Sequence, residues 1–412
     1  MVAKIDAREV MASFRSRAGL YLHVPFCSSL CPFCPYNKVL YRPERAGRFF
    51  EALDREIDAY LAYAEHQFTS LYVGGGTPTL CLDELAAVLR RLPVERERAI
   101  EVLPDHATPE TVARLRDMGI TYVSLGVQSF DERMRRHLGR PGTTEGNLRA
   151  LAQVLGAFDC VDVDLIFDVA FRDASVFLRD VERCMRAGVD QISTYPLMRF
   201  GYTPFGKGRH DSSTEHTVLR EAAVLGERYG YERRSVWTLN RRGGPVYTSI
   251  TRELYLGLGA GAATYTGRDF LVNHFSDERY ADKLERGRLP IARRIALGPL
   301  RSAAYYVFWQ AYAGRIDAER SRELFSSLGV LSALLRVLAR TGHVRLVPGG
   351  AILTPRGYDL YHDLERRVTY GLIEPLWAEM MQEHRASRDG PADPPDLASR
   401  IWRILAGPVE VG

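Results

Sequence analysis

The first half of the chain alternates short apolar, β-branched runs with helical patterns, and this alternation is the feature that most restricts the possible fold. Strands are predicted at 20–24, 70–73, 100–103, 122–125, 161–166 and 191–195. Helices are predicted after them, at 46–64, 82–91, 109–118, 131–137, 145–155 and 175–187. Strand–helix units in succession predict an α/β fold in which a parallel sheet curls into a partial (β/α)6 barrel. Catalytic groups on such folds lie at the C-terminal ends of the strands.

The alternation of strand and helix patterns weakens beyond residue 201. A Gly-rich passage, LYLGLGAGAATYTG, occupies 254–267. Helices predicted at 302–312, 318–324 and 328–340 precede a two-strand ribbon at 343–347 and 351–353. Helix, helix and ribbon in this order predict a smaller, winged-helix-like α+β domain. The resulting division is an extension at 1–19, the barrel at 20–267, a linker at 268–300, the winged-helix-like domain at 301–383 and a tail with a short helix at 384–412.

Composition excludes several classes of protein. The chain has 412 residues with 46% hydrophobic and 26% charged residues, which is ordinary for a globular enzyme. Apolar runs stay well short of the roughly 20 residues that a bilayer requires, and the polar N-terminus lacks the apolar core of a signal peptide. The formal net charge is only +4, which argues against nucleic acid as a partner. We therefore expect a cytoplasmic protein that binds neither membranes nor nucleic acids.

Three of the six cysteines lie close together in the segment YLHVPFCSSLCPFCPYNK, at Cys27, Cys31 and Cys34. The spacing C-x3-C-x2-C places three thiolates on one loop, which is enough to hold three irons of a [4Fe–4S] cluster. The fourth iron stays open and can chelate the amino and carboxylate groups of S-adenosylmethionine (SAM), whose reductive cleavage gives a 5′-deoxyadenosyl radical. The alternative is a zinc knuckle that uses His23 as a further ligand.

The remaining cysteines stand alone and are interpreted as small buried apolar residues: Cys81, Cys160 and Cys184. A second motif, YVGGGTPTL at 72–80, runs from a strand into three glycines. Glycines let the backbone approach a ligand closely and direct its amides toward it. After a C-x3-C-x2-C loop, such a run favours a SAM cradle over an ordinary turn.

Four segments together resemble the radical SAM family of oxygen-independent coproporphyrinogen III oxidases and their relatives. They are YLHVPFCSSLCPFC, GGGTPT, IEVLPDHATPETVARLRDMGITYVSLGVQSF and YLGLGAGA. The resemblance implies that Gly74, Gly75, Gly76 and Thr77 hold the methionine end of SAM and that Glu101 accepts hydrogen bonds from it. It also implies that members can bind two SAM molecules.

Further positions match by the same resemblance. Gln128 and Asp164 would reach the ribose, Arg140 would pair with the SAM carboxylate, and Tyr21 and Phe33 would flank the cluster and the adenosine. The chemistry is suitable, since hydroxyls need acceptors and a carboxylate fits a guanidinium. Two alternatives stay open: Arg140 as a solvated surface residue, and Asp164 as a helix cap.

The chain also departs from its relatives. The porphyrinogen oxidase has a further cysteine two residues after the third ligand, where this chain has Tyr36, and a longer segment before the first strand. A haem-trafficking branch carries a His-Asn and a Tyr-Trp pair before the Gly-rich passage, and neither occurs here. DLIFDVAFRD replaces the usual Gly-Leu-Pro turn, which makes Asp168, Arg172 and the later His274 candidate substrate contacts. Tyr195 is a candidate catalytic acid or base, together with Tyr247; either also suits an aromatic core.

These departures favour a two-SAM carbon methyltransferase or cyclopropanase that acts on an sp2 carbon of an aromatic or conjugated small molecule. The alternatives are a radical enzyme directed at coproporphyrinogen or haem, and a haem-carrying chaperone-like protein. The reductant expected for each enzyme is a flavodoxin- or ferredoxin-like donor.

Overall fold

One mixed sheet of twelve strands organises the molecule, in the order β14-β13-β12-β11-β1-β4-β5-β6-β7-β8-β10-β9. The computed structural model describes residues 5–14, 18–65, 67–206, 212–246, 253–325 and 329–385. Its centre is the predicted barrel, in which neighbouring strands run parallel. These strands are β1 (Gly19–Val24), β4 (Phe68–Gly75), β5 (Val94–Val102), β6 (Tyr122–Gln128), β7 (Cys160–Phe167) and β8 (Gln191–Pro196).

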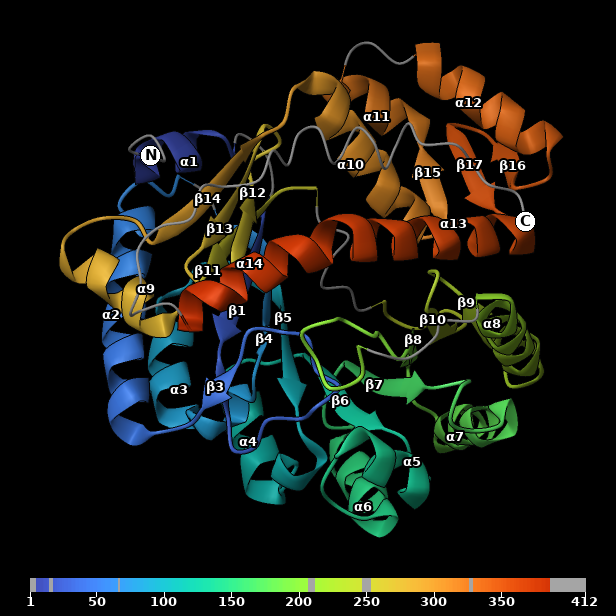
Figure 1. Ribbon diagram of the computed structural model, residues 1–412, viewed down its shortest axis with the longest axis horizontal. Coiled ribbons are helices and arrows are strands. Elements are labelled where there is room, and N and C mark those ends of the chain that lie inside the picture. The colour runs from blue at the N-terminus through green and yellow to red at the C-terminus, as the bar shows by residue number, and fades with distance from the viewer. Residues whose placement is uncertain are drawn as a thin grey trace.

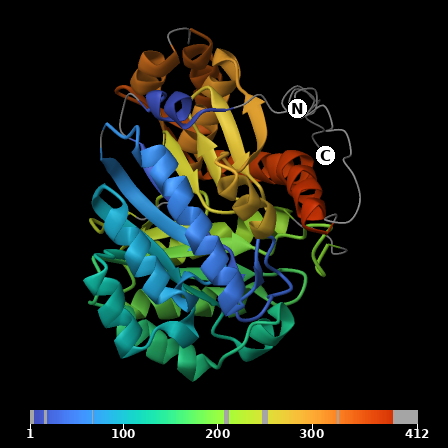
Figure 2. The same ribbon diagram turned by 90° about the vertical axis from the view of Figure 1, so that its left-hand side faces the viewer.

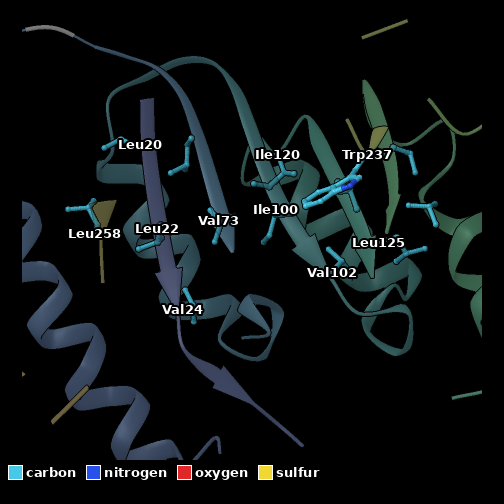
Figure 3. Packing of buried hydrophobic residues seen from close by; sticks show 14 of the residues in the cluster. Leu20, Leu22, Val24, Val73, Ile100, Val102, Ile120, Leu125, Trp237 and Leu258 are labelled. Carbon is cyan, nitrogen blue, oxygen red and sulfur yellow. The ribbon is translucent and has the colours of Figure 1, made fainter. Parts of the chain in front are cut away.

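Helices cover the outer face of this sheet (Figures 1 and 2). They are α2 (Pro43–Leu61), α3 (Leu82–Arg91), α4 (Pro109–Asp117), α5 (Glu132–Leu138), α6 (Thr144–Val154) and α7 (Ala174–Ala187). Successive strand residues point to opposite faces, so Leu20, Leu22 and Val24 share one face and are buried in the hydrophobic core (Figure 3). The alternate residues of the strands point into the barrel.

Further strands extend the sheet at both edges. On one side β11 (Tyr255–Leu258) runs parallel to β1, followed by antiparallel β12 (Ala263–Tyr265), β13 (Asp269–Asn273) and β14 (Ile291–Ala296). On the other side β8 pairs with β10 (Thr238–Arg241) and then β9 (Tyr231–Arg233). Residues 268–300, expected to form a linker, therefore contain β13, α9 (Asp277–Glu285) and β14. The paired arginines in IARRIA interrupt the apolar pattern by which β14 would be recognised.

The C-terminal part contains the predicted helices and ribbon. It consists of α10 (Pro299–Tyr312), β15 (Arg315–Asp317), α11 (Ala318–Phe325), α12 (Gly329–Arg340), β16 (Val344–Val347) and β17 (Gly350–Leu353). The strands form a separate sheet in the order β15-β17-β16. A long helix follows as α13 (Pro355–Val368), a π turn (Thr369–Ile373) and α14 (Glu374–Arg385), and it passes from this part toward β11–β14 (Figure 1).

The short helix predicted within the tail, at 396–405, lies outside the described residues. Within the residues that are described, none of the helices combines the length and the apolar character needed to cross a membrane. Shorter elements complete the chain: α1 (Ala7–Ala12), β2 (Phe26–Cys27), β3 (Val39–Leu40), 3-10 turns at Pro78–Leu80 and Pro104–His106, and α8 (Ser212–Arg228).

A buried carboxyl group ties α2 to the Gly-rich passage behind β1. Glu56 on α2 is 0% exposed and accepts hydrogen bonds from the Gly259 amide (2.8 Å), Asn273 Nδ2 (2.8 Å) and Tyr280 OH (2.6 Å). Burial raises the pKa of Glu56 to about 7, while these donors favour the ionised form. Gly259 has a φ of 97°, and a Cβ there would lie 2.3 Å from the His23 carbonyl oxygen. The network therefore holds this glycine closely against β1.

Replacing Glu56 with Ala leaves three buried donors without their acceptor, so the free energy of unfolding should fall by roughly 3–5 kcal/mol. Glu51→Ala, at an exposed position of the same helix, should change it by less than about 0.5 kcal/mol. Urea unfolding followed by circular dichroism measures both. Equal midpoints for the two variants would contradict the role of Glu56.

Candidate functional site

The three clustered cysteines lie on a loop that is closed at its base by a small parallel ladder. Cys27 ends β2, which pairs with β3, and Cys31 and Cys34 lie between the two strands. Cys27 is buried and the other two are half-buried, and all three thiols are free. Burial raises the pKa of Cys27 to about 11, so the thiolate that a cluster requires forms only with a metal to stabilise its charge. The other cysteines, Cys81, Cys160 and Cys184, are buried as predicted.

The zinc-knuckle alternative is disfavoured by the position of His23. Its Nε2 lies 2.9 Å from the Asn37 carbonyl oxygen and its Nδ1 lies 2.8 Å from Tyr21 OH, so both ring nitrogens are engaged. In the part of the chain that the structure describes, no three His, Cys, Asp or Glu side chains converge closely enough to hold a single ion. A cubane cluster imposes no such convergence, because each thiolate ligates a different iron.

The glycine run begins within the end of β4 and packs directly against β1 and the start of the cysteine loop. A Cβ on Gly76 would lie 2.4 Å from the Phe26 carbonyl oxygen, and one on Gly75, whose φ is 114°, would lie 2.9 Å from the His23 ring. Side chains are therefore excluded from these positions by the loop itself. The close packing places the end of β4 beside Cys27, where Thr77 Oγ1 lies 3.8 Å from the Cys27 sulfur.

Half-buried side chains interrupt the otherwise buried stretches of the barrel strands and face inward; together we call them the inner row. Its members are Tyr21, Glu101, Gln128, Asp164 and Tyr195. Glu101 accepts hydrogen bonds from Tyr72 OH (2.6 Å) and the Gly75 amide (3.2 Å), and burial raises its pKa to about 7.

Two members of the inner row bear on the ribose assignment. Asp164 caps no helix; it lies within β7 and accepts a hydrogen bond from Ser124 Oγ at 2.8 Å. Gln128 has a φ of 67° and is the one residue other than glycine with positive φ among the described residues. Such a conformation costs of order 1 kcal/mol and persists where a function requires it. The bend at the end of β6 thus holds the Gln128 amide beside Gly126 on the inner face.

The guanidinium of Arg140 joins the inner face to the cysteine loop. Its Nη2 donates to the Gly126 carbonyl oxygen at 2.6 Å, and its Nη1 lies 3.5 Å from the Cys31 sulfur. This contact removes the alternative of a solvated surface arginine. Phe33 is buried and packs with Cys31 and Cys34.

The residues present fit the two groups that the motifs imply. The thiols supply three soft ligands, the glycines leave room beside them, and the inner row supplies acceptors for an amino group and for hydroxyls. Arg140 supplies a fork for a carboxylate within reach of the cysteine loop. The cluster, when bound, supplies the electron that cleaves the carbon–sulfur bond of SAM.

Comparison with known proteins agrees with this chemistry. Residues 21–169 match the Radical SAM superfamily. The haem chaperone HemW of Mycobacterium tuberculosis strain H37Rv is 30% identical over 308 residues, which cover 68% of this chain and 77% of that protein. The chain belongs to the HemN/HemW-like family of radical SAM proteins.

Two further relatives belong to the same family. The oxygen-independent coproporphyrinogen III oxidase of Bradyrhizobium diazoefficiens is 26% identical, over 68% of this chain and 69% of that protein. The structure of coproporphyrinogen III oxidase HemN from Escherichia coli aligns with a TM-score of 0.75 and 22% identity, over 86% of this chain and 91% of that one. The α/β radical SAM fold is thus confirmed. The chain is a radical SAM enzyme that uses a [4Fe–4S] cluster and SAM.

The candidate substrate contacts have other partners in this HemN/HemW-like chain. Asp168 is buried and accepts from His137 Nε2 (2.9 Å) and Arg199 Nη2 (2.7 Å), while Arg172 lies 3.4 Å from Asp131. Asp168 therefore anchors the segment after β8. The backbone of His274 accepts from the Gly261 amide and donates to the Pro290 carbonyl oxygen, each at 2.8–2.9 Å.

Of the two tyrosines predicted as a catalytic acid or base, the structure describes only Tyr195. Tyr195 remains on the inner row, in edge contact with Trp237 at 5.8 Å between ring centroids. Burial raises the pKa of Tyr195 well above its usual value, so this phenol stays protonated at neutral pH and can donate a hydrogen bond. Tyr247 lies outside the described residues.

Two residues at the site were not predicted from the sequence, Asn37 and Trp377. Asn37 donates to the carbonyl oxygens of Ala260 (3.1 Å) and Phe275 (2.9 Å), which fixes the cysteine loop to the Gly-rich passage. Tyr36 contacts Trp377 of α14, with ring centroids 5.7 Å apart. An aromatic residue next to the cysteines is visible in the sequence, but the distant tryptophan that packs on it is not.

Cys31→Ala should abolish cluster assembly and SAM cleavage, since two thiolates cannot hold the cubane. Cys81→Ala, which removes a buried thiol outside the site, should keep both. Iron content, the brown absorbance band and 5′-deoxyadenosine formation are the measurements. An unchanged chromophore with unchanged cleavage in Cys31→Ala would refute the cluster assignment.

Replacing Gln128 with Gly removes the side chain and also relieves the strain of the positive φ. The loss of the side chain should change SAM affinity, whereas the relief of strain should change the melting temperature. We expect SAM affinity to fall by roughly tenfold, iron content to stay unchanged, and the melting temperature to stay level or rise. Gln128→Ala should lower the affinity similarly while also lowering the melting temperature. SAM affinity equal to that of the wild type in both variants would exclude the ribose contact.

Proposed function

We propose that the chain is a radical SAM enzyme directed at a tetrapyrrole, such as haem or a porphyrin. The observation that carries this proposal is its relation to HemW, whose name describes a haem chaperone, and to coproporphyrinogen III oxidases. A ligand of this class is flat and largely apolar, and the interior that surrounds the inner row is rich in tyrosine. This proposal adopts the second of our sequence-based expectations rather than the first.

Oxidative decarboxylation of coproporphyrinogen is the less suitable reaction within this class. That substrate carries four carboxylates, which need cationic partners. Acidic side chains act on the tyrosines of this interior: Glu101 on Tyr21 and Tyr36, and Asp164 on Tyr36 and Tyr195. Arg140 is the cation that acts on Asp164, and it is assigned above to the carboxylate of SAM rather than to a substrate. The interior therefore favours the neutral part of a ring system over a group of carboxylates.

Methyl or methylene transfer from a second SAM is the second candidate function. It was our first expectation from the sequence, and the specific observation in its favour is Tyr36, which stands where the porphyrinogen oxidase has a further cysteine. No relative described above carries a methyltransferase name. This reaction needs only an acceptor with an sp2 carbon, and its proton acceptor on this chain would come from the carboxyls of the inner row.

The test uses anaerobically reconstituted, reduced protein and SAM deuterated in its methyl group, with and without haem. Haem should bind near stoichiometrically, and the 5′-deoxyadenosine formed should be unlabelled by mass spectrometry. This is because hydrogen would come from the tetrapyrrole or from uncoupled cleavage rather than from a SAM methyl group.

The two candidates give opposite results in this experiment. Deuterium in 5′-deoxyadenosine, without measurable binding of haem or coproporphyrin, would overturn the tetrapyrrole proposal and support two-SAM chemistry. The Cys31→Ala protein serves as a control, because it should form no 5′-deoxyadenosine yet can still be assayed for haem binding.

A further inference from the structure

Five aromatic side chains gather where the C-terminal helix meets the cysteine loop; we call them the aromatic cap. They are Tyr36, Phe200, Tyr202, Tyr370 and Trp377. Phe200 stacks on Trp377 with centroids 6.2 Å apart and an interplanar angle of 16°. Tyr36 lies 5.7 Å from Trp377, while Tyr370 and Tyr202 lie 5.9 and 5.4 Å from Phe200. The cap thus unites the cysteine loop, the segment after β8 and the C-terminal helix.

Tyr36 has a large exposed surface although it belongs to this cluster. Its side chain is 54% exposed, which is unusual for a tyrosine that contacts a half-buried tryptophan. Its electrostatic neighbours are Cys34 and the inner-row carboxyls Glu101 and Asp164. Tyr36 therefore presents an accessible ring two residues from a cluster ligand.

The cap is held in place from both sides of the barrel. On one side Tyr370 OH accepts from the Arg199 amide at 3.0 Å, and Glu374 accepts from the Gly201 amide. On the other side Met380 is 0% exposed in a cluster with Val272 and Phe275. The helix has its π turn, Thr369–Ile373, beside the first of these contacts, and such turns are frequent at functional sites.

A bond to the cysteine loop completes this arrangement. Tyr202 OH donates to the Pro35 carbonyl oxygen at 3.2 Å. The rings of the cap are thus fixed relative to the cysteines, which is the condition for holding a flat ligand at a defined distance from the cluster.

We propose that the aromatic cap is the binding platform for the flat face of the tetrapyrrole, with Tyr36 and Trp377 as the specificity-determining residues. This inference rests on the proposed function and names the part of the chain that would carry its specificity. Aromatic faces bind a conjugated ring without requiring charge.

The test measures binding of metal-free protoporphyrin IX to the reconstituted protein with SAM, under anaerobic conditions. This probe has no iron, so ligation by a histidine or cysteine cannot substitute for stacking. Free porphyrin is separated by ultrafiltration and quantified by fluorescence. Tyr36→Leu and Trp377→Leu should each weaken binding by roughly tenfold, and Tyr36→Phe and Trp377→Phe by less than about threefold.

A matched control and two readouts separate this role from a structural one. Tyr63→Leu, at a 45% exposed tyrosine outside the cap, should bind like the wild type. Iron content and SAM affinity should be unchanged in Trp377→Leu, which lies off the cysteine loop. If Tyr36→Leu loses iron, its porphyrin affinity also reflects the damaged cysteine loop. The porphyrin affinity of Trp377→Leu then tests whether the aromatic cap binds the ligand.

The outcomes distinguish this inference from the proposed function. Equal porphyrin affinity in the wild type and both leucine variants would overturn the role of the cap but leave the tetrapyrrole function standing. Absence of porphyrin and haem binding in the wild type would overturn both. Weakening by leucine but not by phenylalanine would support both.

Discussion

The imidazole of His23 is the contact on which the rest of the site depends. The Asn37 carbonyl oxygen can only accept, so Nε2 carries the proton and Nδ1 accepts from Tyr21 OH. Burial lowers the pKa of His23 to about 4, which keeps this neutral tautomer at physiological pH. One ring thereby joins β1 to the end of the cysteine loop. The surrounding glycines, Gly75 and Gly259, are required because they pack against His23.

From this point the assembly extends in two directions. Asn37, held by His23, donates to the backbone of the Gly-rich passage, and Glu56 fixes that same passage to α2. In the other direction the Gly75 amide donates a hydrogen bond to Glu101, which is a member of the inner row. The cysteine loop, the glycine run and the row of acceptors are therefore parts of one hydrogen-bonded structure. A group bound at the cysteines meets preorganised acceptors rather than side chains that must first be ordered.

The sequence predicted what depends on local pattern. The six parallel strands and their helices follow from alternation of apolar runs, and the cysteine spacing identified the cluster loop. What it missed depends on contacts between distant segments. Val94–Arg98 begins β5 although its charges resemble a loop, because pairing with β4 outweighs propensity. The left-handed backbone of Gln128 and the packing of Trp377 on Tyr36 leave no local pattern.

The C-terminal helix explains how an open, partial barrel can still enclose a site. A sheet with free edges at β14 and β9 does not close on itself, and the strands alone leave the inner row accessible. The chain closes it with α13 and α14, which reach from the segment after β8 to β13 and β14 (Figure 1). Radical chemistry requires exclusion of water and of stray hydrogen donors. A closure made from a helix with its own anchors adds aromatic side chains to those that the barrel strands already provide, Tyr21 and Tyr195. The elements from α10 to β17 lead directly into this helix, which runs from them to β13 and β14.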